Sequence, residues 1–236
     1  MSNLGKVVKT VLCAAGAVAG AAAYMGALDN LHVPAFCTKG RKRVACVGDS
    51  ITYGCFVAGQ PWNSYPRRLG KLLGKEYCVG NFGYTNRTCI NTADYPYTAE
   101  KLYKQSLDFR PEIVFIMLGG NDSKEINWDP DKFRADMGSL VDSYRDLDTH
   151  PEVYMLLTPP AFPVMGKVMW DIREEVLRDE VIPACRQVAE EKGIALIDTR
   201  TVFDGRKDLF VDGCHPSRRG ARLLAETVYA GLTSNK

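Results

Sequence analysis

Short apolar runs alternate with longer amphipathic segments along most of this chain, and this rhythm restricts the fold more than any other feature of the sequence. The apolar runs are 44–47, 77–82, 113–118, 153–157 and 194–197. Each is almost continuously apolar, which is typical of parallel strands covered on both faces. Apolar residues at helical spacing mark 65–73, 99–109, 131–147, 172–191 and 218–232. The sequence therefore predicts an α/β fold in which crossover helices join five parallel strands.

The N-terminal segment has a different composition from the rest of the chain. Residues 10–28 are uncharged and rich in Ala and Gly, and Lys6 and Lys9 precede them. This pattern is typical of a cleaved signal peptide or of a signal anchor that spans the membrane through residues 7–28, and both alternatives stay open. We expect residues 1–28 to be this targeting segment, 29–42 a linker and 43–236 one folded domain. The expected location is extracytoplasmic, either secreted or anchored to the membrane.

Charge and cysteine content exclude some classes of function. The formal net charge of +2 comes from the two lysines of the leader, so the remainder of the chain is neutral and offers no electrostatic attraction for nucleic acid. The chain has eight cysteines but no C-x-x-C pair, which argues against a zinc site. Cys46 and Cys78 fall inside predicted strands, where a free cysteine acts as a small apolar residue. A single disulfide between Cys78 and Cys89 stays open.

Polar or small residues follow four of the five predicted strands at the end where open α/β sheets bind ligands. Ser50 follows the first strand, Gly83 the second and Asn121 the third. Asp212 and His215 follow the fifth strand and precede the last helix. Each has an ordinary alternative: Ser50 as a helix N-cap, Gly83 and Asn121 as turn or cap residues. Their expected meeting at one sheet edge favours a shared site.

These residue types suit acyl transfer by a serine nucleophile. The hydroxyl of Ser50 needs a base to take its proton, and a histidine oriented by a carboxylate is the usual base. Asp212 lies three positions before His215, close enough for a tight turn to bring its carboxylate to Nδ1. The backbone N–H groups of Ser50 and Gly83 and the amide of Asn121 would bind the oxyanion of the tetrahedral intermediate.

The loop 83–98 is long for an α/β fold and rich in polar and aromatic residues. Loops of this length in a compact domain are more often functional than structural. We therefore expect it to contribute to the same site.

Four sequence blocks carry a resemblance to a known family. They are "GDSITYG" at 48–54, the glycine of "NFG" at 81–83, "GGND" at 119–122 and "DGCHPS" at 212–217. In order and spacing they resemble the blocks of the SGNH hydrolases, also called the GDSL family. The resemblance covers about residues 43–232 and makes 43–236 an SGNH hydrolase domain. It implies a three-layer α/β/α sandwich, flavodoxin-like, with strand order 2-1-3-4-5, and no metal or organic cofactor.

The resemblance also implies a role for each residue of the predicted site. Ser50 is the nucleophile and one oxyanion donor. Gly83 and Asn121 are the other donors, and His215 is the base that Asp212 orients.

Within that family, three phrases look most like bacterial carbohydrate esterases that remove acetyl groups from polysaccharides such as xylan. They are "PWNSYP" at 61–66, "GGNDSKEINW" at 119–128 and "LFVDGCHPS" at 209–217. The resemblance implies a serine esterase that removes O-acetyl groups from a carbohydrate through a covalent acetyl-enzyme. Its partner is then an acetylated carbohydrate.

Aromatic residues on or near the same loops are candidates for stacking on a sugar ring. They are Trp62, Tyr84, Tyr95, Trp128 and Trp170. We take Trp62, Tyr84 and Trp128 as the predicted sugar contacts, with packing inside the loops as the alternative.

Three other functions stay open. An O-acetyltransferase acting on envelope glycans would use the same acyl-enzyme with a different acceptor. A lipase-like esterase or thioesterase would differ in acyl chain length. A non-catalytic glycan-binding module would have no need for Ser50, Asp212 and His215 together, so the presence of all three argues against it.

Overall fold

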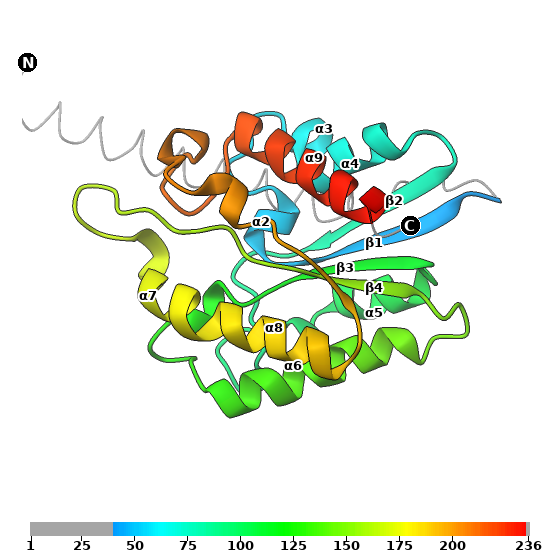
Figure 1. The fold of residues 1–236 in the computed structure, drawn as a ribbon, viewed down its shortest axis with the longest axis horizontal. Helices are drawn as coiled ribbons and strands as arrows, with labels where there is room; N and C mark the ends of the chain where they lie inside the picture. Colours follow the sequence, from blue (N-terminus) through cyan, green and yellow to red (C-terminus); the bar gives the residue numbers. More distant parts are fainter. Residues whose placement is uncertain (1–39, 235–236) are drawn as a thin grey trace, which may run out of the picture.

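A parallel five-stranded sheet lies between two layers of helices (Figure 1) in the computed structural model, which describes residues 40–234. The strands are β1 (Lys42–Gly48), β2 (Tyr77–Gly83), β3 (Ile113–Met117), β4 (Glu152–Leu156) and β5 (Ala195–Ile197). They lie in the order β2-β1-β3-β4-β5, and every neighbouring pair is parallel. The prediction of an α/β sandwich with strand order 2-1-3-4-5 is confirmed.

Helices connect the strands much as the apolar spacing predicts. They are α2 (Ser50–Tyr53), α3 (Gln60–Asn63), α4 (Tyr65–Leu73), α5 (Lys101–Asp108), α6 (Pro130–Arg145), α7 (Glu174–Val176), α8 (Ile182–Glu191) and α9 (Arg218–Ser234). Short 3-10 helices are η1 (Tyr97–Ala99), η2 (Asn121–Ser123), η3 (Met169–Asp171), η5 (Thr201–Phe203) and η6 (Lys207–Leu209). The predicted helix 172–191 is not one regular helix, because the π-helical turn η4 (Leu177–Val181) separates α7 from α8.

Two apolar clusters, one on each face of the sheet, form the core. On one face Cys46 and Phe115 are fully buried in a cluster that includes residues of α4 and α9. On the other face Val47 and Ile116 are fully buried with residues of α6 and α8. Figure 1 shows α4 and α9 on one side of the sheet and α5, α6 and α8 on the other. Burial on both faces explains why each strand is a continuous apolar run.

Helix boundaries follow local capping chemistry. The carboxylate of Asp129 accepts the N–H of Lys132, and Pro130 occupies the first position of α6, where a missing N–H costs nothing. Helix α4 has a proline in its first turn and ends at Leu73, because the next residue, Gly74, has a φ of 83° that is incompatible with a helix.

Residues 1–28, the predicted targeting segment, and 29–39 of the predicted linker lie outside the described residues, so the predicted location stays a prediction. Within 40–234, no helix is both long and apolar enough to cross a membrane. In that same part of the chain, no group of His, Cys, Asp and Glu side chains is arranged to hold a metal ion. Cys78 is disulfide-bonded, whereas Cys89 is a buried free thiol, so the two do not pair.

Candidate active site

The turn from β1 into α2 places Ser50 at the carboxyl edge of the sheet. Asp49 caps the helix, because its Oδ1 accepts the N–H of Ile51 at 2.9 Å. A Cβ at Gly48 would lie only 2.4 Å from the carbonyl oxygen of Met117, so this close turn requires glycine. Ser50 is therefore the first residue of α2 and not its cap, which leaves its hydroxyl for another partner.

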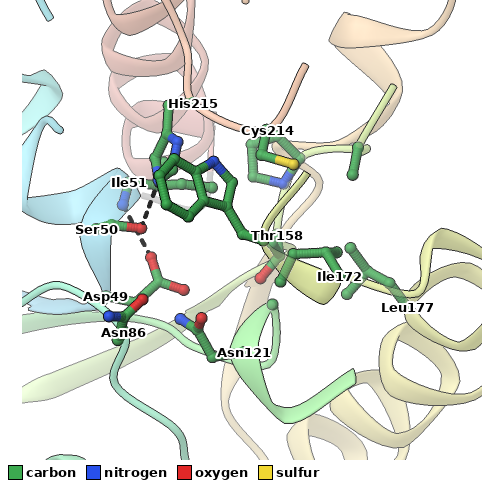
Figure 2. Close-up of a pocket in the computed structure, with 14 residues that line it drawn as sticks. Asp49, Ser50, Ile51, Asn86, Asn121, Thr158, Ile172, Leu177, Cys214 and His215 are labelled. Carbon is green, nitrogen blue, oxygen red and sulfur yellow. Dashed lines mark hydrogen bonds between the residues drawn. The ribbon is translucent and has the colours of Figure 1, made fainter. Parts of the chain in front are cut away.

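A chain of hydrogen bonds joins Ser50 to two residues that precede α9. The Oγ of Ser50 lies 2.8 Å from Nε2 of His215 (Figure 2). Nδ1 of His215 lies 2.7 Å from Oδ2 of Asp212. The other oxygen, Oδ1, accepts the backbone N–H groups of Cys214 at 3.0 Å and of His215 at 2.7 Å. This is the geometry of a serine nucleophile with a base held by a carboxylate.

The turn at 212–215 holds the carboxylate of Asp212 in place, and its surroundings keep that carboxylate ionised. Gly213 has a φ of 87°, and a Cβ there would lie 2.2 Å from the carbonyl oxygen of Phe162. Burial by itself would raise the pKa of Asp212, but the hydrogen bond and charge of His215 oppose it. With the indole N–H of Trp170 added, the pKa of Asp212 lies well below its usual range. Asp212 is therefore an anion at neutral pH.

Asn121 points its amide into the same site from the turn that follows β3 (Figure 2). Its Nδ2 donates one hydrogen to the carbonyl oxygen of Arg87 at 3.2 Å, which leaves the second amide hydrogen for a ligand. The side chain of Asn127 donates to the backbone carbonyl of Asn121 at 3.0 Å and so holds this turn in place. The amide is thus positioned to bind an oxyanion.

The predicted role of Gly83 as an oxyanion donor needs correction. Its N–H donates to Oδ1 of Asn81 at 3.0 Å, and Gly83 does not line the pocket around Ser50. A Cβ at Gly83 would lie 2.2 Å from the backbone nitrogen of Tyr53, so this glycine lets α2 pack against the end of β2. Asn86, three positions later, lines the pocket instead.

The pocket beside Ser50 has an empty volume of about 430 Å³. Its polar residues are Asp49, Ser50, Asn86, Asn121, Thr158 and His215. Its apolar residues include Ile51, Pro159, Ala161, Trp170, Ile172 and Leu177. A cleft lined by Ser50, His215 and the amide of Asn121 together with apolar side chains suits a small ester group.

The sequence pattern that defines the GDSL-like lipase/acylhydrolase family matches residues 46–223, a range that includes Ser50, Asp212 and His215. The chain belongs to this family. The prediction of an SGNH/GDSL-type hydrolase is confirmed at that level.

Two curated relatives of this GDSL-family chain are named for esters of acetic acid. An acetylxylan esterase of Xylanibacter ruminicola is 35% identical over 209 residues, covering 80% of this chain but 43% of that protein. The chain thus spans less than half the length of this relative. An isoamyl acetate-hydrolyzing esterase 1 homolog of Mus musculus is 28% identical over 204 residues, covering 77% of this chain and 78% of that protein.

Solved structures agree on the GDSL-family fold. The carbohydrate acetylesterase Est24 from Sinorhizobium meliloti superposes with a TM-score of 0.65 at 19% identity, covering 83% of this chain and 100% of that one. At this identity the likeness shows the fold alone.

A buried carboxylate attaches the loop 83–98 to the site. Asp122 is fully buried and accepts the backbone N–H groups of Cys89 and Ile90, both at 2.8 Å. Burial raises the pKa of Asp122 to about 7, against the effect of these hydrogen bonds. The loop, and Asn86 within it, is therefore held against the turn that carries Asn121.

Replacing Asp122 with alanine should lower the free energy of unfolding by about 2–5 kcal/mol, because two buried N–H groups lose their acceptor. Urea denaturation measures this loss. The matched control is Asp136→Ala. Asp136 is partly exposed, and its carboxylate accepts the backbone N–H of Asn91, a residue of the same loop 83–98. Water can replace that acceptor, so the control should lose less than about 1 kcal/mol. Equal losses in the two variants would contradict the anchoring role of Asp122.

Asp49 is a second buried carboxyl group, and it faces the pocket. Burial raises its pKa to about 6, although the hydrogen bond from Ile51 lowers it. Because the folded state holds this proton more tightly than the unfolded chain, the stabilisation from protonated Asp49 is present below about pH 4 and is lost as the pH rises through about 6.

The substitution Asp49→Asn keeps the helix cap and removes this titration. Relative to wild type, the variant should gain up to about 3 kcal/mol of unfolding free energy between about pH 4 and pH 7.5. Urea denaturation at both pH values measures the gain. Asp129→Asn, the same change at the exposed cap of α6, should show no such gain. If the difference in unfolding free energy between Asp49→Asn and wild type were the same at both pH values, the pKa of Asp49 would not be raised in the folded protein.

The three predicted sugar contacts do not line the pocket. Trp62 lies on α3 with its side chain 64% exposed and borders a different hollow. The ring of Tyr84 lies 4.1 Å beneath the guanidinium of Arg87. The ring of Trp128 packs against Phe133 at 5.4 Å. Packing, the alternative to sugar stacking, describes Tyr84 and Trp128 in this structure.

Sequence reasoning missed two residues that border the catalytic histidine or the pocket. Asn86 has a φ of 64°, and asparagine is the residue that most readily replaces glycine in that conformation. An asparagine in the polar loop after the second strand was therefore a usable indication. Phe56 packs against His215 at 5.2 Å between ring centres, and nothing in its neighbourhood of the sequence marks it.

Proposed function

We propose that this chain is a serine acetylesterase that removes O-acetyl groups from a carbohydrate. The observation that carries the proposal is the hydrogen-bonded series Ser50, His215 and Asp212 at the edge of a pocket fit for a small acyl group. Both curated relatives support the acetyl part, since one is named for acetylxylan and the other for isoamyl acetate, and the first also supports a carbohydrate as the alcohol.

The mechanism follows from the distances. Oγ of Ser50 attacks the carbonyl carbon of the acetyl ester while Nε2 of His215 takes its proton, and Asp212 stabilises the imidazolium that forms. Nε2 then gives this proton to the leaving sugar oxygen, and the acetyl group stays on Ser50. His215 next takes a proton from water, the hydroxide attacks the acetyl-enzyme, and acetate leaves as Oγ regains its proton.

Asn86 supplies the third oxyanion donor in this proposal, in place of Gly83. It lines the pocket opposite His215, and its positive φ turns the backbone of the loop at that point. Its N–H joins the N–H of Ser50 and the amide of Asn121 as donors to the oxyanion.

The pair Asn86→Gly and Asn86→Val tests this role. Glycine adopts a positive φ freely and should keep kcat within about threefold of wild type. Valine disfavours that conformation by roughly 1–2 kcal/mol, so its N–H should move and kcat should fall about 10-fold to 100-fold. Steady-state hydrolysis of an acetyl ester measures both. If valine and glycine have the same kcat, the backbone of residue 86 does not bind the oxyanion.

Acetate release from acetylated glycans is the experiment for the proposed function. The full chain is incubated with acetylated xylo-oligosaccharides and with simple acyl esters of increasing chain length, with the inactive variant Ser50→Ala as blank. We expect acetate from the saccharides and falling rates beyond the acetyl group. Transfer of the acetyl group to an added glycan without acetate release, or a preference for long acyl chains, would contradict the proposal.

A further inference from the structure

We propose that Phe56 and Trp170 form the wall of the active site on which the sugar of the leaving alcohol stacks. This inference rests on the proposed function, because the leaving alcohol is a sugar only if that function holds. It replaces Trp62, Tyr84 and Trp128 as the sugar contacts.

The mechanism fixes where the sugar must lie. Nε2 of His215 protonates the leaving oxygen, so that oxygen comes within about 3 Å of Nε2. The oxyanion points the other way, toward Asn121, and Figure 2 shows His215 and Asn121 on opposite sides of Ser50. The sugar therefore leaves the reacting carbon on the side of His215.

Two aromatic rings border His215 on that side. The ring centre of Phe56 lies 5.2 Å from the imidazole and that of Trp170 lies 5.9 Å from it. The two rings lie 6.1 Å apart in a stacked arrangement, with an angle of 28° between their planes, so they form one aromatic cluster against the imidazole. A sugar whose oxygen receives the proton from His215 must pass along these rings.

Both rings are unusually exposed for side chains of their size. Phe56 is 52% exposed and Trp170 is 47% exposed, beside a pocket that contains the catalytic base. Both residues have a positive φ, 60° and 64°, which costs roughly 1–2 kcal/mol in a residue with a Cβ. Strain of this kind is kept where the surrounding structure needs the side chain in one place.

The indole of Trp170 is fixed before any ligand binds. Its Nε1 donates to Oδ2 of Asp212 at 2.7 Å, the oxygen that also binds His215. The ring cannot turn away without breaking this hydrogen bond. A preformed surface of two aromatic faces suits the C–H face of a pyranose ring, since little side-chain entropy is lost on binding.

The test compares two acetyl esters, an acetylated xylo-oligosaccharide and ethyl acetate, whose leaving alcohol has no ring. For Phe56→Ala we expect the ratio of kcat/KM for the saccharide to kcat/KM for ethyl acetate to fall roughly tenfold, mainly through KM. Trp170→Phe keeps a ring but loses the hydrogen bond to Asp212, so it should lower kcat for both esters and change the ratio less. Trp62→Ala, an exposed aromatic outside the pocket, should leave both rates unchanged.

A binding measurement separates this inference from the proposed function. In the Ser50→Ala background, calorimetry with the acetylated xylo-oligosaccharide should give a Kd that Phe56→Ala raises roughly tenfold. An unchanged Kd and an unchanged ester ratio would overturn the aromatic wall even if wild type deacetylates saccharides. Wild type that hydrolyses ethyl acetate but neither binds nor deacetylates the saccharide would overturn the proposed function, and the wall with it.

Discussion

Ser50→Ala should lower kcat for acetyl ester hydrolysis by about 10,000-fold or more, because no other hydroxyl lies within hydrogen-bonding distance of His215 among the described contacts. The substitution removes only the hydroxyl oxygen of the first residue of α2. The N-cap hydrogen bond made by Asp49 is unaffected. The fold should therefore be retained, as circular dichroism and urea denaturation would show. Stopped-flow release of the alcohol and intact mass of the acetyl-enzyme measure the loss.

Ser139→Ala is the matched control for that prediction. Ser139 lies on the exposed face of α6, and its hydroxyl donates to the carbonyl oxygen of Ala135, one turn earlier in the same helix. Its kcat should equal that of wild type. A Ser50→Ala variant that keeps more than about a tenth of the wild-type kcat, or still accumulates an acetylated chain, would rule out Ser50 as the nucleophile.

Asp212→Asn should lower kcat by roughly 1,000-fold to 10,000-fold at neutral pH, through the tautomer of His215. Oδ1 of residue 212 accepts two backbone N–H groups, so the amide oxygen will occupy that position. The NH₂ group then replaces Oδ2 and donates to Nδ1 of His215. The imidazole proton is forced onto Nε2, which can no longer accept the proton of Ser50.

The NH₂ group of Asp212→Asn also faces the indole N–H of Trp170, so two donors meet where one acceptor stood. The hydrogen bond of Trp170 should be lost, which a change in tryptophan fluorescence would report. Asp204→Asn, the same change at an exposed turn residue, serves as control. Activity of Asp212→Asn close to that of the control would mean that the carboxylate does not orient the base.

The hydrogen-bonded series Ser50, His215 and Asp212 was predictable from the pattern of buried strands and from the spacing of two of its members. Parallel strands buried on both faces produce continuous apolar runs, and the residue after each run must lie at the carboxyl edge of the sheet. That rule places Ser50 at this edge, and His215 reaches the same edge from the segment between β5 and α9. Asp212 follows from its three-residue spacing to the base, which the structure closes through a positive-φ glycine.

The proposed oxyanion donor in the loop after β2 was not predictable in the same way. A glycine after a strand can serve as a hydrogen-bond donor or simply make room for another element. Gly83 makes room for another element, because the backbone nitrogen of Tyr53 lies too close for any side chain at this position. This close approach depends on how α2 packs against β2, which the sequence does not reveal. We propose Asn86 as the donor instead, and no spacing rule reveals its positive φ.

The aromatic contacts were harder still. A tryptophan in a loop can point into the site, into the core or into solvent, and tertiary packing alone decides. Trp128 packs against Phe133, whereas Trp170 turns over His215. Phe56, in a short turn with a positive φ, has no sequence pattern that would separate it from an ordinary loop residue.

The anchoring of the loop 83–98 by Asp122 has a consequence for how this site can be altered. The amide of Asn121 bonds to Arg87, and the neighbouring carboxylate of Asp122 bonds to Cys89 and Ile90. The two segments therefore behave as one rigid part. Grafting the loop alone into a related hydrolase would transfer residue 86 without its anchor, whereas grafting 83–98 together with 119–123 would transfer two of the three proposed oxyanion donors, Asn86 and Asn121, with the contacts that hold them.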